Sequence, residues 1–533
     1  MSQLNEWTAE VAQSTHVLET GRREAPARLP RRALVLLAAS TAIAAAGGSY
    51  IATNASAPPA GGPAVADVHL PGAAASVVSG SPAAMAAEVA HRLFTSSPVV
   101  VVANGEGSAS MLALASTDAR RASAPMLLTS IGQHPGLLLS GAAFAEIKAL
   151  HPDDVLAVGV SGHVLAADLS GTNVVTSMSA LPATSRALPL RHVALLVPAG
   201  HRSAATVAAI ATAKSAGVQV IPARKADPRA DSISINSLAK SKPNQVLALG
   251  GAFGTAKGLA AKVAVAETGV QLPGGGQILF PGHRLVCLYG SPGAPALGAL
   301  GEQNLRASIG RIRKLAATYR SLSRVPVVPA FEILATVAEA SPGRSGLYSH
   351  ENSVASLRPW VRAANKAGLY VILDLQAGRA NLLAQAKMYQ SLLKLPDVGL
   401  ALDPEWKLQA GQLPLKQIGS VSVTQVNSVI AWLAALTARY HLPQKVLVLH
   451  QFQPLMIQGE SRLDTGNSDL AIVIHMDGQG SPSSKQQTWD AIVGAAPPGV
   501  FFGWKNFFVK DQPMLDPRQT MKHWPQPVMI SYE

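Results

Sequence analysis

Residues 398–406 read VGLALDPEW, an apolar run that ends in an aspartate, a proline, a glutamate and a tryptophan. A short continuous apolar run bounded by turn-forming residues is typical of a strand that is buried on both faces. The pattern therefore predicts a buried strand that brings two carboxylates and an aromatic ring to the point where it ends.

The same pattern recurs through the C-terminal half of the chain. From residue 281 onward, apolar runs of strand length alternate with amphipathic stretches of helical length. The runs are RLVCLYG, VPVVPAFEI, GLYVILDLQ, VGLALDPEW, KVLVLHQF, LAIVIHMDG, GVFFGWKNF and PVMISY. Eight strands and their connections in about 250 residues match the size of a (β/α)8 barrel. We predict a TIM-type barrel over residues 281–533, with irregular connections after the fifth and seventh strands.

Polar residues end nearly every predicted strand, and the active site of such a barrel forms at this end. We predict catalytic roles for four carboxylates, Glu405, Asp403, Glu332 and Asp374. The predicted substrate-binding residues are Tyr289, Gln376, Trp406, His450, Gln451, His475, Asp477, Trp504, Lys505 and Asn506. For any single carboxylate, a structural role such as capping a helix is the alternative.

Carboxylates beside aromatic rings suit glycoside hydrolysis, which needs a proton donor and a second carboxylate. Crowding of Asp403 and Glu405 is expected to raise one pKa, so that this carboxyl becomes the donor. Two other chemistries stay open: a hydrolytic metal site built from His475, Asp477, His450 and Asp403, and a Schiff base on Lys505. No H-E-x-x-H spacing supports the first, and we predict neither a resident metal nor a cofactor.

The LDPEW segment resembles the end of strand four in the chitinase-like family 18 hydrolases. This resemblance implies that Glu405 protonates the glycosidic oxygen and that Asp403 orients a substrate acetamido group. Two earlier aspartates of the family motif fall on Val398 and Ala401, and Lys505 stands where many hydrolase families carry a nucleophilic glutamate. These departures keep open an alternative, a non-catalytic glycan-binding or cell-wall-binding protein with a degenerate barrel pocket.

Residues 86–275 show a second arrangement of strand-like and helix-like runs. The strand-like runs PVVVVANG, APMLLTS and DVLAVGV are paralleled by HVALLVPAG, GVQVIPA and QVLALGG. We predict an α/β layered domain with parallel-sheet repeats. The order resembles the cell-wall-binding repeat of the type 2 family, without a GADRY opening, and the resemblance implies non-covalent attachment to envelope polymers. A phosphate-binding role is the weaker alternative, because no G-x-G-x-x-G or Walker motif occurs.

The N-terminal region carries a targeting pattern. Residues 22–32 hold five arginines against one glutamate, and residues 33–52 form an apolar run of about the length that spans a bilayer. We predict a cytoplasmic segment over 1–32, a signal anchor or signal peptide over 33–52, and an Ala/Pro/Gly-rich linker over 53–85. The rest is then exported, and either anchored to the outer face of the membrane or associated with the wall.

Composition restricts the partners. The net charge of +13 is spread along the chain and is not interleaved with aromatics, so we predict no nucleic-acid partner. The expected partners are a cell-envelope glycan or polymer and, through the N-terminal helix, the membrane. The single cysteine, Cys287, lies in an apolar run and is expected to be a buried core residue. The blocks PAFEILATVA, LALDPEW, VLHQF and GWKNF resemble a group of actinobacterial exported proteins of unassigned activity. No sequence feature sets the oligomeric state.

Overall fold

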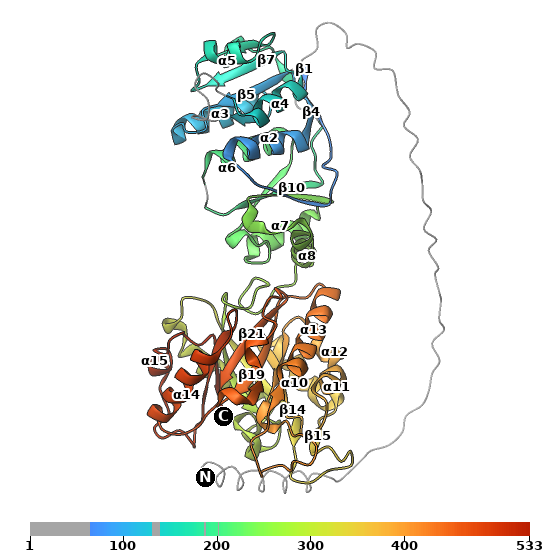
Figure 1. Cartoon of the computed structure of the whole chain (residues 1–533), viewed down its shortest axis with the longest axis vertical. Helices are drawn as coiled ribbons and strands as arrows, with labels where there is room; N and C mark the ends of the chain where they lie inside the picture. The colour runs from blue at the N-terminus through green and yellow to red at the C-terminus, as the bar shows by residue number, and fades with distance from the viewer. Residues whose placement is uncertain (1–63, 130–138, 186–187, 201) are drawn as a thin grey trace, which may run out of the picture.

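A computed structural model describes residues 64–129, 139–185, 188–200 and 202–533. These residues form an α/β region followed by a barrel (Figure 1). The predicted cytoplasmic segment and apolar helix, residues 1–52, lie outside the described residues. Within the described ranges, every helix is too short or too polar to cross a bilayer.

The C-terminal barrel is closed by eight parallel strands of the described chain. In chain order they are β13 (Arg284–Gly290), β14 (Val327–Ala338), β16 (Tyr370–Leu375), β17 (Val398–Leu402), β19 (Lys445–Gln451), β21 (Leu470–Met476), β22 (Phe501–Asn506) and β23 (Met529–Tyr532). Each strand pairs with the next, and β13 pairs with both β14 and β23, which closes the ring. The predicted α/β class and TIM-type barrel are confirmed. Each of the eight strands overlaps one predicted run, and β14 extends beyond its run to Ala338.

Helices follow most of the barrel strands and cover the outside of the sheet. They are α9 (Leu305–Ala317), α10 (Val354–Lys366), α11 (Leu382–Met388), α12 (Gln390–Leu393), α13 (Val423–Arg439), α14 (Pro482–Ala495) and α15 (Pro517–Thr520). Asn304, Ser353, Ser422 and Ser481 each cap a helix by accepting a backbone N–H bond, which fixes where that helix begins.

The irregular connections lie where the sequence predicted them. After β19 come only η8 (Pro454–Met456), β20 (Ile457–Gln458) and η9 (Glu460–Arg462), and after β22 only the short α15. The other short elements of the barrel region are β15 (Ser349–Glu351), β18 (Val421–Ser422), η4 (Pro295–Leu297), η5 (Ala299–Glu302), η6 (Arg320–Leu322) and η7 (Pro404–Trp406). Of these, β15 pairs antiparallel with the end of β14 and extends one wall of the barrel.

The barrel interior changes from apolar to polar along its axis. Near the N-terminal strand ends it is filled by side chains such as Cys287, Tyr370 and Val446. Gly399 makes room there, because a Cβ at this position would lie 2.5 Å from Val446 Cγ1. Cys287 is a buried free thiol, as predicted. The polar residues of the interior lie at the other end, which is the functional end of such barrels.

The α/β region contains two four-stranded parallel sheets among its described residues. The first has the order β6 (Met126–Leu128), β5 (Val99–Ala103), β7 (Asp154–Val158), β8 (Asn173–Val175), and the second has the order β11 (Gln219–Ala223), β10 (Val193–Pro198), β12 (Gln245–Leu249), β3 (Ala75–Val78). The six predicted runs supply the first three strands of each sheet, in the same order twice. One hydrophobic cluster contains buried residues of both sheets.

Helices pack on and between the two sheets. They are α2 (Pro82–Leu93), α3 (Ala109–Arg121), α4 (Gly141–Leu150), α5 (Gly162–Asp168), α6 (Ala204–Ser215), α7 (Ser232–Ser241) and α8 (Ala256–Ala266), with the short η1 (Met178–Ala180), η2 (Arg224–Ala226) and η3 (Gly251–Phe253). Ser81, Ser108, Ser140, Ser203, Asp231 and Thr255 cap six of these helices.

The segment predicted as a linker is partly folded. From residue 64 it forms β1 (Ala64–Val65), which pairs with β9 (Thr184–Ser185), β2 (Asp67–Val68), which pairs with β4 (Phe94–Ser96), and β3. The fourth strand of the second sheet is thus β3, which comes before all strands of the first sheet in the sequence. The prediction of a linker up to residue 85 is therefore wrong from residue 64 onward. The composition of this segment is that of a linker, but β1, β2 and β3 are held by pairing with strands farther along the chain.

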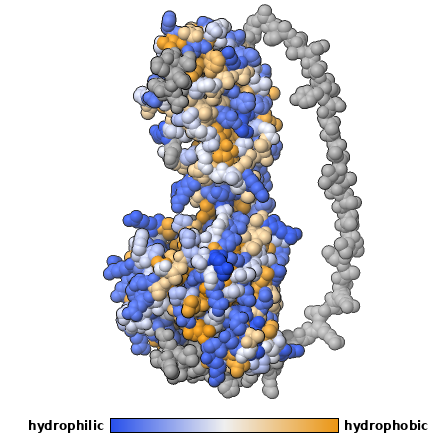
Figure 2. All heavy atoms as spheres, viewed as in Figure 1, coloured by the Kyte–Doolittle hydropathy of each residue, from blue (hydrophilic) through white to orange (hydrophobic). Residues whose placement is uncertain are grey.

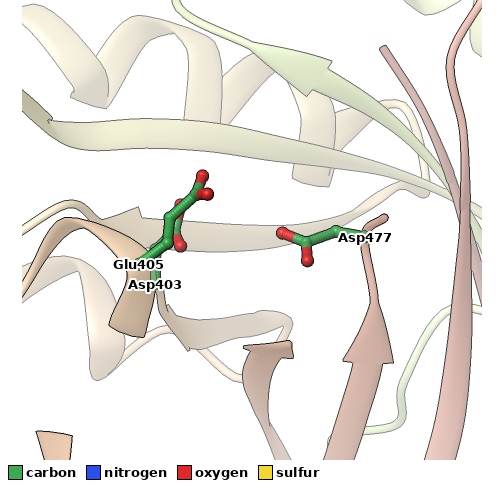
Figure 3. Close-up of side chains that lie close together, drawn as sticks. All are labelled: Asp403, Glu405 and Asp477. Carbon is green, nitrogen blue, oxygen red and sulfur yellow. The ribbon is translucent and has the colours of Figure 1, made fainter. Parts of the chain in front are cut away.

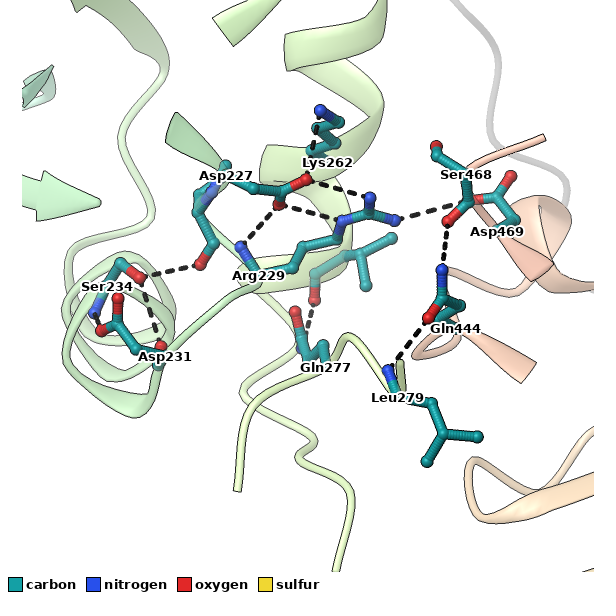
Figure 4. A network of polar contacts seen from close by, with 12 residues as sticks. Asp227, Arg229, Asp231, Ser234, Lys262, Gln277, Leu279, Gln444, Ser468 and Asp469 are labelled. Carbon is teal, nitrogen blue, oxygen red and sulfur yellow. Dashed lines mark hydrogen bonds and ion pairs between the residues drawn. The ribbon is translucent and has the colours of Figure 1, made fainter. Parts of the chain in front are cut away.

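The two bodies meet through a buried polar network (Figure 4). Arg229 of the α/β region lies 3.6 Å from Asp469 of the barrel, and its carbonyl accepts a 2.8 Å bond from the Gln277 backbone. The Gln444 side chain accepts from the backbone N–H groups of Leu279 and Phe280. The connecting segment is therefore bonded to both bodies.

Candidate active site

The polar end of the barrel gathers side chains from all eight described strands or their following residues. Alternate residues of a barrel strand face the interior, and the inward-facing polar ones here are Tyr289, Glu332, Asp374, Gln376, Asp403, His450, His475, Asp477, Lys505, Ser531 and Glu533. Most of them are buried. Glu332 was predicted at a strand end but lies inside β14, because this strand continues to Ala338. It consequently sits deeper than the other acids.

His450 joins two of the predicted acids. Its Nε2 lies 3.0 Å from Glu332 Oε1, and its Nδ1 lies 3.2 Å from Asp477 Oδ2. Burial by itself lowers the pKa of His450, but the charge of Glu332 and hydrogen bonds to both carboxylates raise this pKa well above its ordinary value. His450 is therefore an imidazolium at neutral pH and holds Asp477 in place.

Lys505 of β22 is a second buried cation at this end of the barrel. Its Nζ lies 2.6 Å from Glu533 Oε2 and 3.6 Å from the centre of the Tyr289 ring. Burial lowers the pKa of Lys505, but the charges of Glu533 and Asp477 outweigh burial and leave this pKa above its ordinary value. A Schiff-base lysine must lose its proton to attack a carbonyl, so this environment opposes the Schiff-base alternative.

Three carboxylates face one another at the centre of the site (Figure 3). Asp403 and Glu405 follow β17, Asp477 follows β21, and one oxygen of each lies within 4.8 Å of the others. Burial and then the charge of Asp477 raise the pKa of Glu405 to about 8. Burial and then the charge of Glu405 raise the pKa of Asp403 well above its ordinary value. At neutral pH, Glu405 consequently holds a proton that it can donate.

Asp374 supplies a deeper carboxyl group. Burial raises its pKa to about 6, against the opposing charge of His450. In the strand register Asp374 lies beside Ala401, one of the positions where the family 18 motif would have an aspartate.

A cavity of about 170 Å³ opens above these groups. Glu405, Asp477 and Lys505 line it, as do Tyr289 and Gln376. Trp406 also lines the cavity, at 8 % exposure, so two predicted aromatic residues, Tyr289 and Trp406, are at the site.

Three predicted binding residues point away from the cavity. The indole of Trp504 packs against α14, lies 3.7 Å from the His523 ring and donates to Asn506 Oδ1. Gln451 is hydrogen-bonded to Glu460, outside the barrel. Each of them neighbours an inward residue, Lys505 or His450, so strand alternation turns them outward. None of the three lines the cavity.

His475 lies deeper than predicted. Its Nε2 is 2.6 Å from Ser531 Oγ, and its ring packs edge-on against His450. Burial and the charge of His450 lower the pKa of His475 well below its ordinary value, so this ring is neutral. It supports His450 from below and does not line the cavity.

Several lining residues escaped the sequence prediction. Glu533 follows β23, while Phe452 and Phe507 follow β19 and β22. The rule that selected the other strand ends would have found Glu533, which comes directly after PVMISY. The two phenylalanines end the quoted runs KVLVLHQF and GVFFGWKNF, and no role was predicted for them.

Three carboxylates at this site could hold a metal ion through oxygen atoms. Both nitrogens of His450 face carboxylates, and Nε2 of His475 faces Ser531. Of the nitrogen ligands in the predicted metal alternative, His475 Nδ1 is buried without a hydrogen-bond partner among the described residues. The cluster of Asp403, Glu405 and Asp477 offers the hard oxygen ligands that Ca²⁺ or Mg²⁺ prefers over zinc.

The fold and the pocket define an α/β protein with a TIM-type barrel whose strand ends carry a carboxylate-rich cavity. No family model matches the chain, and none of the curated proteins matches it. Among solved structures it is similar to Cwp6 from Clostridium difficile, with 14% sequence identity and a TM-score of 0.18. The match covers 64% of this chain and 66% of that chain. A similarity at this level carries no argument about function.

Proposed function

We propose that the barrel is a hydrolase that cleaves a glycan or glycoconjugate of the cell envelope, with Glu405 as the proton donor. The observation that carries the proposal is the Glu405 carboxyl, which faces the cavity opposite Asp477 and whose pKa is raised to about 8. Glycosidases need a carboxylic acid that stays protonated at working pH beside a second carboxylate.

Asp477 is the proposed second carboxylate. His450 Nδ1 lies 3.2 Å from Asp477 Oδ2 and fixes the position of this carboxyl group. One oxygen of Asp477 and one of Glu405 lie within 4.8 Å of each other, so both carboxyl groups can reach the same glycosidic bond. Asp477 would attack the anomeric carbon while Glu405 protonates the leaving oxygen, and water would then release the sugar with net retention.

The proposed setting is the outer face of the membrane or the wall. The apolar segment over 33–52 and its arginine-rich flank motivate export. The paired parallel sheets fit the α/β layered domain that the repeat resemblance implies. We propose that this region associates with an envelope polymer and keeps the barrel near its substrate.

The test compares the full chain with Glu405→Gln and Asp477→Asn on a panel of envelope glycans and synthetic glycosides. New reducing ends are counted by mass spectrometry, and NMR records the anomer first released. We expect cleavage with retention by the unchanged protein, and at least a hundredfold loss in either variant. Glu106→Gln, an exposed glutamate of the α/β region, is the matched control. Binding by every variant without cleavage by any would instead support the glycan-binding alternative.

A further inference from the structure

We propose that the substrate of this barrel is an amphiphilic glycoside, with the sugar on the cavity floor and an alkyl-like aglycone along the walls. The inference rests on the proposed hydrolase function and specifies the class of its substrate. It comes from the distribution of polar and apolar side chains with depth.

The floor of the cavity is polar and charged. It consists of side chains from or directly after the barrel strands, namely Tyr289, Gln376, Glu405, Asp477, Lys505 and Glu533. These groups offer both donors and acceptors, including the Lys505–Glu533 ion pair at 2.6 Å. A sugar ring placed here finds hydrogen-bond partners next to the proposed proton donor.

The walls of the cavity are mostly apolar. They come from the loops beyond the strands and from the extension of β14, and include Leu297, Val337, Ile418, Phe452 and Phe507, with Gln479, Thr488 and Lys510 as the polar lining residues beyond the strands. The apolar side chains provide no hydrogen bonds to hydroxyl groups. Burying a hydroxyl without a partner is unfavourable, so a second sugar of a polysaccharide is poorly accommodated against them. An alkyl chain gains from the same contact.

Exposed apolar side chains also occur on the loops that supply lining residues. Leu455 is 81% exposed and lies in the loop that starts at the lining residue Phe452. Val509 is 80% exposed and lies between the lining residues Phe507 and Lys510 in the sequence. These two side chains are available to an apolar group that extends beyond the cavity.

Lining residues come from all eight described barrel strands or the loops after them, so they surround the mouth of the barrel. A substrate that reaches the carboxylates enters through this mouth. The end that enters first is polar and the part that follows is apolar. This order is that of a sugar attached to a lipid-like group.

The experiment uses methyl, hexyl and octyl β-D-glucosides and the matching N-acetyl-β-D-glucosaminides below micelle-forming concentrations. Affinity is measured by titration of the full chain carrying Glu405→Gln, and kcat/KM with the unchanged full chain. Each buried CH₂ is worth up to about fourfold, so we expect the hexyl compound to bind at least tenfold more tightly than the methyl compound. Equal affinity along the series, or tighter binding of a hydrophilic oligosaccharide, overturns the inference.

Two variants test where the alkyl group of the ligand lies in the cavity. Ile418→Ser on the wall and the double change Leu455→Ser with Val509→Ser on the loops that supply lining residues should each lower the octyl-to-methyl affinity ratio severalfold. Leu188→Ser, which is 88% exposed in the α/β region, is the matched control and should leave this ratio unchanged. A ratio unchanged in both test variants overturns the placement along the walls.

The two proposals fail separately. Cleavage of methyl and octyl glycosides at equal rates would overturn the amphiphilic substrate and leave the hydrolase standing. An alkyl preference in binding, with no cleavage of any glycoside, would contradict the hydrolase and leave an amphiphile-binding pocket.

Discussion

At the scale of single residues, the site depends on which carboxyl groups keep their protons. Six acids, Glu332, Asp374, Asp403, Glu405, Asp477 and Glu533, share the polar end of the barrel with two cations, His450 and Lys505. Crowding of buried like charges disfavours the ionised form of an acid and raises its pKa. Glu332, Asp477 and Glu533 lie against the two cations, whereas burial and then the charge of Asp477 raise the pKa of Glu405, which lines the cavity, to about 8.

The proton on Glu405 predicts a pH profile. Its pKa is about 8 and the acid form is the active one, so kcat/KM should be level below about pH 7 and fall tenfold per unit well above pH 8. Hydrolysis rates measured across pH 5–10 at low substrate concentration give kcat/KM and show whether it falls above pH 8. A rate that rises through pH 8 would show that the ionised form of Glu405 is needed and would remove it as the donor.

The pairing of His450 predicts a change in stability. His450→Gln leaves Glu332 and Asp477 buried without their cation, which should lower the free energy of unfolding by about 3–5 kcal/mol. The raised pKa of His450 in the fold means that its contribution is full below the unfolded value of 6.5 and is lost as pH rises through the folded value. Urea denaturation at pH 6 and pH 9 should thus show the larger loss at pH 6.

A double change checks this pairing. Adding Glu332→Gln to His450→Gln removes a carboxylate that His450→Gln leaves unpaired. The combined loss should therefore be smaller than the sum of the two single losses. Strictly additive losses would mean that the two side chains do not interact.

At the scale of elements, neighbouring strands shape the site by leaving room for each other's side chains. Gly503 of β22 lies beside His475 of β21 in the register, and a Cβ on Gly503 would be 2.1 Å from His475 Nδ1. The small residue on one strand is what lets the ring on the next strand reach Ser531. Gly399 and Tyr370 make a similar arrangement lower in the barrel.

Gly503→Ala should therefore be destabilising by about 1–3 kcal/mol, because His475 must leave its position. Thermal unfolding followed by circular dichroism measures the loss. Gly494→Ala in α14 is the matched control, since nothing lies within 4 Å of its Cβ. Alanine there should stabilise the helix by about 0.5–1 kcal/mol. Equal effects of the two changes would contradict the close approach at Gly503.

At the scale of the whole molecule, described segments far apart in sequence complete each other. β3 precedes the first sheet yet fills the edge position beside β12 of the second. The barrel and the α/β region are joined by Arg229, Gln277 and Gln444. On the face drawn in Figure 2, hydrophobic residues are dispersed among hydrophilic ones over both bodies.

The position of β3 predicts how truncation acts. A chain that starts at residue 85 lacks β3 and exposes the edge of β12, so it should give less soluble protein and unfold at a lower temperature than a chain that starts at residue 64. Yield and light scattering of the two chains, produced in parallel, make the comparison. Identical behaviour would mean that β3 contributes little to the fold.

The junction predicts coupling between the bodies. Arg229→Met removes a side chain that is 3% exposed and leaves Asp227 and Asp469 with fewer partners. We expect a loss of about 1–3 kcal/mol and a separation of the unfolding transitions of the two bodies in calorimetry. Lys240→Met, at an exposed position of α7, is the matched control and should leave the trace unchanged.

Much of this architecture was determined locally by the sequence. Each barrel strand is a continuous apolar run, and each run is bounded by residues that stop it, so the eight strands and the two sets of α/β strands could be predicted from short windows. The polar residues at the strand ends could be predicted for the same reason. Strand alternation would also have separated Lys505 from Trp504 and Asn506, because neighbours on a strand face opposite sides.

Only the tertiary structure decided which of these residues meet. The pairing of His450 with Glu332 joins positions 118 residues apart, the approach of Asp477 to Glu405 depends on barrel closure, and β3 finds its partner β12 across the whole first sheet. No short window contains both members of such a pair. The raised pKa of Glu405 has the same origin, because burial and neighbouring charge exist only when distant strands come together to exclude water.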